Sequence, residues 1–527
     1  MYKKRKKVGQ YNFNKQFPYS LLLLFSLLIS SFLIIYSWNK GFDLSDEGFY
    51  LLMADPLQSN EFNLTRYDLF FKIVHEFFHF EFGIASLRII RYILYLITLI
   101  PLALVVIQHN QLTSRTLIFN ISITILLSLF LSYGFQPHSL SYNHLNVFFS
   151  SCLIFLIYKL NNNQALSVWK ILWLGLILGF IFYIKISTAL LLTIVSLVLL
   201  IKRHRFTYKL FIIILPLCVF ELIFYFRLNQ SLLQSVFLHS SLNFNRTDYG
   251  IFDLSKNLIV GGVWTSLFFC SGILIAKSSK IKNLYYKTAF IIFILVIILW
   301  CLAMVKIAEP WVFLYPAVLL IILGFLSLHY IKKRTRGEDL VIYLLLLFFP
   351  FILHAGSNLY FYWVNIHYSF SWVILIFLIS KDNPQLRRFV FLLILGSPLL
   401  IWDGLWNRPF QQCGIVENIN SYSYREGKEI YISTSLFNLL GEIKNRLTEH
   451  EEIDLIPLYR NPGINYLLGK QVPYIPGYWD QNHFKAIYKE GKNKRLFIYN
   501  GVFELPKFDS EEDIILFTYP RDVVCVE

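Results

Sequence analysis

Charged side chains are scarce in this sequence. Of its 527 residues, 15% are Asp, Glu, Lys or Arg, whereas 56% are hydrophobic and 18% are aromatic. The mean hydropathy is +0.54, and a soluble globular protein would carry about 25% charged residues. This composition excludes a soluble globular protein and predicts an α-helical polytopic membrane protein.

Patterns for metal and nucleic-acid binding are also missing. No Cys-x-x-Cys pair or Cys/His ligand spacing is present. The net charge of +15 comes from short clusters of Lys and Arg that separate apolar runs, rather than from one basic domain. Charge distributed in this way indicates membrane topology and predicts no nucleic-acid partner.

Only two of the six cysteines lie in a polar segment. Cys413 and Cys525 stand near the two ends of the C-terminal part, and they could form a disulfide if that part lies outside the cytoplasm. The others lie in apolar runs, where we expect them to pack as small hydrophobic side chains: Cys152, Cys218, Cys270 and Cys301.

A helix needs about 20 mainly apolar residues to cross a bilayer, and the sequence offers thirteen candidate spans. The first follows Lys3–Lys7, as in a signal peptide, but it is too long and lacks a small-residue cleavage site, so we expect a retained span. The fifth and sixth could instead form one bent hairpin. The candidates lie at 18–38, 87–107, 117–133, 144–160, 171–186, 187–201, 210–227, 259–276, 288–305, 311–330, 340–355, 362–380 and 389–402.

The positions of Lys and Arg indicate which ends of these spans face the cytoplasm. With the N-terminus inside, every even-numbered exit carries positive charge. An odd number of spans then places residues 403–527 outside, on the same side as Asp46. We therefore expect a multi-pass protein of a bacterial inner membrane or plasma membrane, with a periplasmic or extracellular C-terminal domain.

Two domains are expected. Residues 1–402 form a transmembrane domain, whose first outer loop, 39–86, carries amphipathic segments at 47–54 and 67–82 that we expect along the membrane surface. Residues 403–527 form a small α/β domain that covers or gates the membrane site. Its expected elements are strands at 429–433, 453–457, 495–499 and 514–519, a helix at 434–448 capped by Ser433 or Thr434, and a loop at 471–478.

Three carboxylates follow the first span directly. Asp43, Asp46 and Glu47 fall within five positions, next to apolar residues that include Phe49 and Tyr50. Short acidic clusters commonly cap helices, and we interpret Asp43 as a loop or capping residue. Asp46 and Glu47 are instead predicted to form a site, because an apolar wall can shift the pKa of a carboxylate toward catalytically useful values.

The segment Asp46-Glu47-x-x-Tyr50 resembles the Asp-Glu-x-x-Tyr motif of GT-C membrane glycosyltransferases, at the start of their first outer loop. The likeness is to the glycosyltransferase family 39-like group, which holds protein O-mannosyltransferases and the aminoarabinose transferases that modify lipid A. It continues at Lys72, Phe82-Gly83 and Leu87-Arg88. The sequence departs from the family at Ile73-Val74, where paired prolines are usual.

The resemblance implies a reaction. A sugar carried on a polyprenyl phosphate would be the donor at the outer membrane face, and a lipid, glycan or protein acceptor would attack its anomeric carbon with inversion. A hydroxyl acceptor needs a general base, and the leaving phosphate needs positive charge. We expect Asp46 to be the base. Glu47 would orient it, bind the acceptor or help to hold a divalent cation, and no other cofactor is indicated.

Two cations are candidates for binding the phosphate. Arg88 and Lys185 both lie near outer ends of spans. Arg88 is favoured by the resemblance, whereas Lys185 interrupts two apolar runs, where an unpaired charge is costly and therefore usually paired or functional. Arg88 could instead pair with Glu81 or Asp68, and Lys185 could extend to the membrane surface.

Other residues are candidates for binding the sugar or lipid. Tyr50 and Lys72 are carried over from the resemblance. His354 and His367 flank the aromatic loop Gly356–Trp363, which is suited to stacking on a sugar, although aromatic residues are routine at membrane surfaces. The outer loop around Arg246 is polar and could face the substrate.

Two other functions stay open. A polysaccharide polymerase or ligase acting on lipid-linked glycans would carry large Arg-rich outer loops, whereas the loop 228–258 contains only Arg246 and Lys256. A lipid-linked sugar transporter would show internal repeats and ionisable groups near the middle of the membrane, and we find no repeat. The sequence does not identify the sugar, the acceptor or the oligomeric state.

Overall fold

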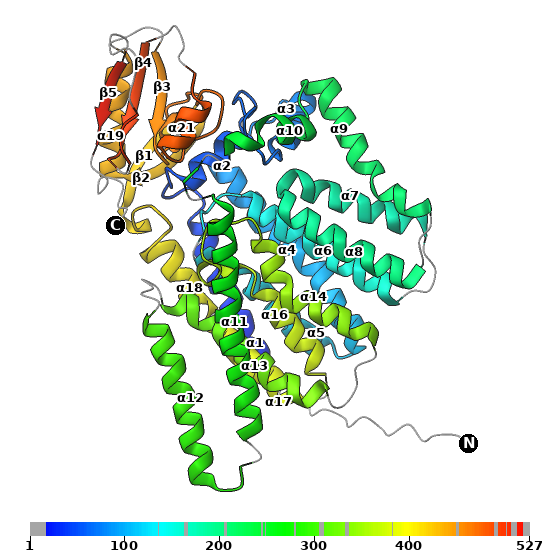
Figure 1. Ribbon diagram of the computed structural model, residues 1–527. Helices are drawn as coiled ribbons and strands as arrows, with labels where there is room; N and C mark the ends of the chain where they lie inside the picture. Colours follow the sequence, from blue (N-terminus) through cyan, green and yellow to red (C-terminus); the bar gives the residue numbers. More distant parts are fainter. Residues whose placement is uncertain are drawn as a thin grey trace.

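Most of the chain is helical, as its apolar runs predict (Figure 1). The computed structural model describes residues 17–134, 136–162, 167–204, 208–243, 246–247, 249–278, 281–304, 310–331, 337–381, 383–448, 453–489, 494–501, 503–506 and 514–519. The first half contains α1 (Phe17–Tyr36), α2 (Asp46–Ala54), α3 (Asp68–Phe78), α4 (Ile84–Asn110), α5 (Arg115–Phe130), η2 (Leu131–Gly134), α6 (Tyr142–Asn162), α7 (Val168–Ile184), α8 (Ile186–His204), η3 (Tyr208–Ile213), α9 (Leu215–Leu228) and α10 (Leu232–Asn243). There follow α11 (Ile251–Ser278), α12 (Leu284–Met304), α13 (Pro310–Ile331), α14 (Gly337–His354), α15 (Phe361–Val364), η4 (Asn365–His367), α16 (Phe370–Ile379), α17 (Pro384–Ile394), α18 (Ser397–Trp402), η5 (Asp403–Asn407) and η6 (Ile415–Glu417).

Seven helical segments of the described residues are long and apolar enough to span a membrane: Tyr19–Tyr36, Ile84–Asn110, Arg115–Gly134, Tyr142–Asn161, Phe211–Leu228, Ile251–Ser278 and Pro384–Asn407. The bent pair Phe361–His367 and Phe370–Ile379 makes eight if it is one span. Shorter apolar helices lie at Val168–Ile184, Ile186–Ile201, Leu284–Val296, Val312–Ser327 and Leu340–His354. Every candidate span overlaps a helix, but the count of thirteen stays a prediction.

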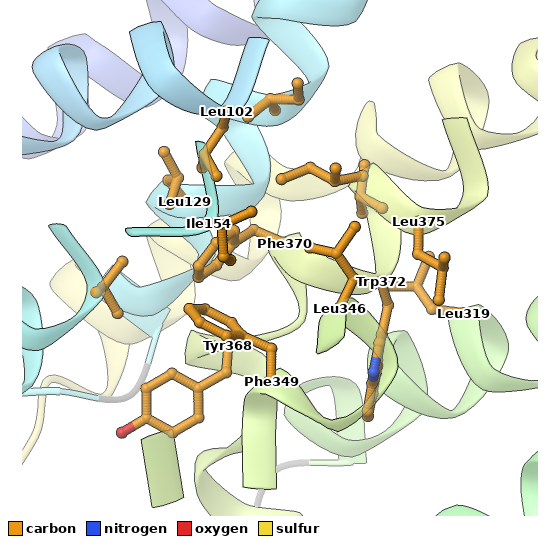
Figure 2. Close-up of a cluster of buried hydrophobic side chains, with 14 of the residues drawn as sticks. Leu102, Leu129, Ile154, Leu319, Leu346, Phe349, Tyr368, Phe370, Trp372 and Leu375 are labelled. Carbon is orange, nitrogen blue, oxygen red and sulfur yellow. The ribbon is translucent and has the colours of Figure 1, made fainter. Parts of the chain in front are cut away.

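The core of the helix bundle surrounds α16, on which every side chain from Phe370 to Ile379 is buried. A helix that is apolar on all sides is expected to be buried on all sides. Figure 2 shows Phe370 and Trp372 of this helix among side chains from α4, α5, α6, α13 and α14. The indole Nε1–H of Trp372 donates to the Leu347 carbonyl at 3.0 Å, so the one polar group of this buried ring has an acceptor.

The C-terminal part holds two small sheets. In the first, β1 (Asn418–Arg425) runs antiparallel to β2 (Lys428–Ser433). In the second, β3 (Ile453–Leu458), β4 (Lys494–Tyr499) and β5 (Ile514–Thr518) are parallel in that order, with Leu455 opposite Leu496 and Leu496 opposite Ile515. The helices are α19 (Thr434–Thr448), α20 (Gly463–Leu467) and α21 (Gln481–Ile487).

Most of the predicted elements of this part are confirmed. The four expected strands and the helix 434–448 are present, and the Ser433 hydroxyl caps that helix by accepting from the Leu436 N–H at 3.3 Å. The prediction missed β1, whose alternate residues are largely exposed and polar, and the short helices α20 and α21. Cys413 is disulfide-bonded, and its predicted partner, Cys525, lies outside the described residues.

The C-terminal domain packs on the loop 39–86. The Gly463 N–H donates to the Leu44 carbonyl at 2.8 Å. The side chain of Gln58 donates to the Val472 carbonyl at 2.7 Å and accepts from the Val472 N–H at 2.9 Å. Apolar residues of both segments share one core, and in Figure 1 the sheets lie beside α2 at one end of the bundle. Which side of a membrane this end faces stays a prediction.

The contact between α2 and α20 depends on two glycines. A Cβ added to Gly463 would meet the Phe42 ring at 2.6 Å and the Leu44 Cα at 2.8 Å. A Cβ added to Gly48 would meet the Gly463 Cα more closely still. A side chain at either position would therefore push the C-terminal domain away from α2.

We expect Gly463→Ala to destabilise the protein by about 1–3 kcal/mol, the usual cost of overpacking, and to lower the unfolding temperature of the purified protein. The matched control is Gly441→Ala on α19, where an added Cβ meets nothing within 4 Å. Equal unfolding temperatures for the two variants would contradict this account of the contact.

Candidate functional site

Asp43 caps the start of α2. Its side chain accepts hydrogen bonds from the N–H groups of Ser45 at 2.8 Å and of Asp46 and Glu47 at 3.0 Å each. Burial raises the pKa of this carboxyl well above its usual value, and the neighbouring Asp46 adds to the shift. Asp43 therefore has the capping position predicted for it, and its oxygens satisfy the free N–H groups of the first turn.

Glu47 is buried in an ion pair with Arg88 on α4. The Nε and Nη2 groups of Arg88 each donate to one Glu47 carboxylate oxygen at 2.8 Å, and both side chains are at most 1% exposed. The Ser139 hydroxyl donates to the same carboxylate. Burial opposes ionisation of Glu47, but the charge and hydrogen bonds of Arg88, together with smaller effects of His138 and Ser139, lower the pKa of Glu47.

Arg88 also binds the backbone that follows α1. Its Nη1 donates to the carbonyls of Ser37 at 2.9 Å and Lys40 at 2.8 Å, and its Nη2 donates to that of Gly41 at 2.7 Å. Arg88 pairs with neither Glu81 nor Asp68, the acidic partners considered from the sequence, since its carboxylate partner is Glu47. The Glu47–Arg88 pair therefore holds the backbone between α1 and α2 in place.

Among the described residues, no group of three His, Cys, Asp or Glu side chains could hold a metal ion.

Asp46 is different from its two acidic neighbours. Its side chain is half-buried, and no group among the described residues donates a hydrogen bond to its carboxylate. Burial raises the pKa of Asp46 to about 6, while the positive charges of Arg460 and Arg246 act in the opposite direction. A carboxyl with this pKa can accept a proton near neutral pH, which is the requirement for a general base.

Three segments distant in the sequence meet around Asp46. The Phe49 ring on α2 lies 5.3 Å from the Trp479 ring of the C-terminal domain. The guanidinium of Arg246, from the loop before α11, lies 4.9 Å from the Trp479 ring. The Thr247 N–H and hydroxyl both donate to Asp480 at 3.0 Å, which fixes this loop against the C-terminal domain.

Tyr50 joins this arrangement to the helix bundle. Its ring contacts that of Tyr142, at the start of α6, with centroids 5.9 Å apart. Burial raises the pKa of Tyr50 well above 10, and the charge of Asp46 is the next cause. Tyr50 thus keeps its hydroxyl proton. The hydroxyl can donate or accept a hydrogen bond, but it does not ionise.

Lys72 belongs to a separate polar cluster. Its Nζ lies 3.4 Å from an Asp68 carboxylate oxygen, which also binds the Asn60 amide at 3.1 Å. The other oxygen of Asp68 accepts from Arg66 Nε at 3.2 Å. This cluster, in which Lys72 is buried, ties α3 to the loop before it.

Lys185 and His367 lie on other elements. Lys185 separates α7 from α8, and its Nζ donates to the Leu353 carbonyl at 2.6 Å. His367 ends η4, and its ring lies 6.2 Å from that of Tyr368, whose hydroxyl donates to Asn143 at 3.3 Å. Among the described residues, no contact joins Lys185 or His367 directly to Asp46.

Arg460 and Trp479 were not predicted from the sequence. Arg460 follows the C-terminal end of β3, which is parallel to β4, and binding residues are often found at that edge of a parallel sheet. The polar segment after the predicted strand 453–457 could therefore have been predicted to contribute a binding residue. No comparable signal marks Trp479, because its position depends on how the segments pack.

In comparisons with known proteins, the sequence matches no protein-family model and no curated protein.

We expect Arg88→Met to destabilise the protein by about 3–5 kcal/mol, because it leaves the Glu47 charge buried without a partner. Arg408→Met is the control, since Arg408 pairs with Asp403 while 48% exposed, and removing such a pair costs at most about 1 kcal/mol. Denaturant unfolding of both purified variants measures the difference. Similar losses in the two would show that the buried pair has no special structural role.

Proposed function

We propose that the protein is an inverting glycosyltransferase that moves a sugar from a polyprenyl-phosphate donor to a hydroxyl acceptor at the outer membrane face, with Asp46 as general base. The observation that carries this proposal is the state of the Asp46 carboxylate. It is half-buried, has no hydrogen-bond donor among the described residues, has a pKa of about 6 and lies near two arginines.

The proposed step needs little from the protein beyond position and charge. The acceptor oxygen forms a bond to the anomeric carbon while its proton passes to the Asp46 carboxylate. The bond between that carbon and the phosphate oxygen breaks, and the phosphate leaves with the electron pair. Phosphate is a weak base, so it needs positive charge rather than a proton donor.

Arg246 is the cation best suited to the leaving phosphate. Its charge acts on Asp46, and its guanidinium is held by the Tyr249 ring at 4.7 Å and the Trp479 ring at 4.9 Å. Arg88 and Lys185, the cations expected from the sequence, already donate to Glu47 and to the Leu353 carbonyl. An aromatic side chain such as Trp479 also offers a face on which a sugar ring can stack.

The first test identifies the product and then removes the base. Mass spectrometry of envelope glycans from cells with and without the protein reports the sugar and the acceptor. Asp46→Asn should then lower transfer by about 10²–10⁴-fold, the usual contribution of a general base, in vesicles that contain the purified protein and donor.

The matched control is Glu61→Gln, an exposed carboxylate of the same outer loop, which should leave transfer unchanged. Full transfer by a folded Asp46→Asn protein would remove the base assignment. Passage of the lipid-linked sugar across the vesicle membrane without transfer would instead favour a transporter.

The pH dependence gives a second test. Because burial raises the pKa of Asp46 to about 6, the carboxylate becomes protonated as pH falls through this value. A protonated carboxyl accepts no proton, so the transfer rate should fall about tenfold per pH unit below pH 6. A rate independent of pH between 5 and 7, measured where the protein stays folded, would contradict the assignment.

A further inference from the structure

Two contacts of the C-terminal domain stand on either side of Asp46. The Leu44 carbonyl accepts from the Gly463 N–H at 2.8 Å, and the Phe49 ring lies 5.3 Å from the Trp479 ring. Leu44 precedes Asp46 by two positions, and Phe49 follows it by three. Asp46 therefore faces the surface of the C-terminal domain that lies between these contacts.

Arg460 belongs to that surface and is held there by its own backbone. It follows β3 by two residues and has a φ of +58°, a left-handed conformation that few non-glycine residues adopt. Its N–H donates to the Tyr478 carbonyl at 2.9 Å, and its Nε donates to the Trp479 carbonyl at 3.3 Å. Backbone strain of this kind persists where the surrounding structure determines it, and it is common at functional sites.

We propose that Arg460 is a positioning residue for Asp46, by which the C-terminal domain brings a fixed positive charge to the carboxylate and keeps it ionised. The consequence for catalysis rests on the proposed function, whereas the charge interaction does not. The domain then completes the site: when it is docked on α2, the base is ready to accept a proton.

The charges around Asp46 agree with this role. Of the two arginines that lower the pKa of Asp46, Arg460 has the larger effect and Arg246 the smaller. Among the described residues, Arg460 is the only charged group of the C-terminal domain that acts on this pKa. The charged or titratable groups that face Asp46 are Asp43 in the preceding loop, Tyr50 on α2, Tyr142 on α6, Arg246 before α11 and Arg460 after β3.

The test measures the protonation of Asp46 directly. Infrared difference spectra of the full-length protein, recorded across pH and assigned by subtraction of Asp46→Asn, give the pH at which this carboxyl is half protonated. Arg460→Gln removes the charge but keeps an amide that can donate to the Trp479 carbonyl. We expect it to raise the midpoint by roughly one pH unit or more, the usual effect of an opposite charge within a few ångströms.

The matched control is Lys470→Gln, which removes an exposed positive charge from the same domain and should leave the midpoint unchanged. Arg460→Met is the second charge-removing variant, to be used if the glutamine variant does not fold. In transfer assays, the acidic limb of the pH profile should move with the infrared midpoint, and Arg460→Lys should return it toward the wild-type position.

An unchanged midpoint in either folded charge-removing variant would overturn the proposal, as would an equal shift in Lys470→Gln. The proposed function fails by a different result. If Asp46→Asn transfers sugar normally, Asp46 is not the base, yet the infrared midpoint still decides whether Arg460 controls its charge.

Discussion

The buried ion pair between Glu47 and Arg88 is the interaction on which the rest of the site depends. One guanidinium binds the Glu47 carboxylate and the carbonyls that follow α1, so a single side chain joins α1, α2 and α4. Removing two charges from water costs free energy, and the cost is offset here because each charge has several well-aligned partners. The pair fixes the start of α2, and thereby the position of Asp46.

Adjacent carboxylates at this helix start have opposite environments. Glu47 has its oxygens bound to Arg88 and Ser139, and its pKa is lowered. Asp46 is half-buried without a donor among the described residues, and its pKa is raised to about 6. When the environment drives the pKa values of neighbouring acids apart in this way, the two acids generally serve different roles. In this protein the pattern separates a structural residue from a candidate for proton transfer.

The C-terminal domain is part of the site rather than an appendage. It shares an apolar core with the loop 39–86, and glycines on α2 and α20 let the two backbones approach closely. Its Arg425 also forms ion pairs with Asp55 and Glu81 of that loop. A domain held by packing, hydrogen bonds and charge keeps Trp479 against Phe49 and keeps Arg460 where its charge acts on Asp46.

The sequence by itself determined the helical membrane character, the strands at 429–433, 453–457, 495–499 and 514–519, and the place of Asp43 as a loop or capping residue, because hydrophobic periodicity and helix capping depend on residues close together in the chain. It did not determine how many helices span a membrane, since several are short and bent. Only the tertiary structure decided that Arg88 binds Glu47 and that the charge of Arg460 acts on Asp46. Such contacts join positions far apart in the chain, and their partners are selected by packing, which no local pattern records.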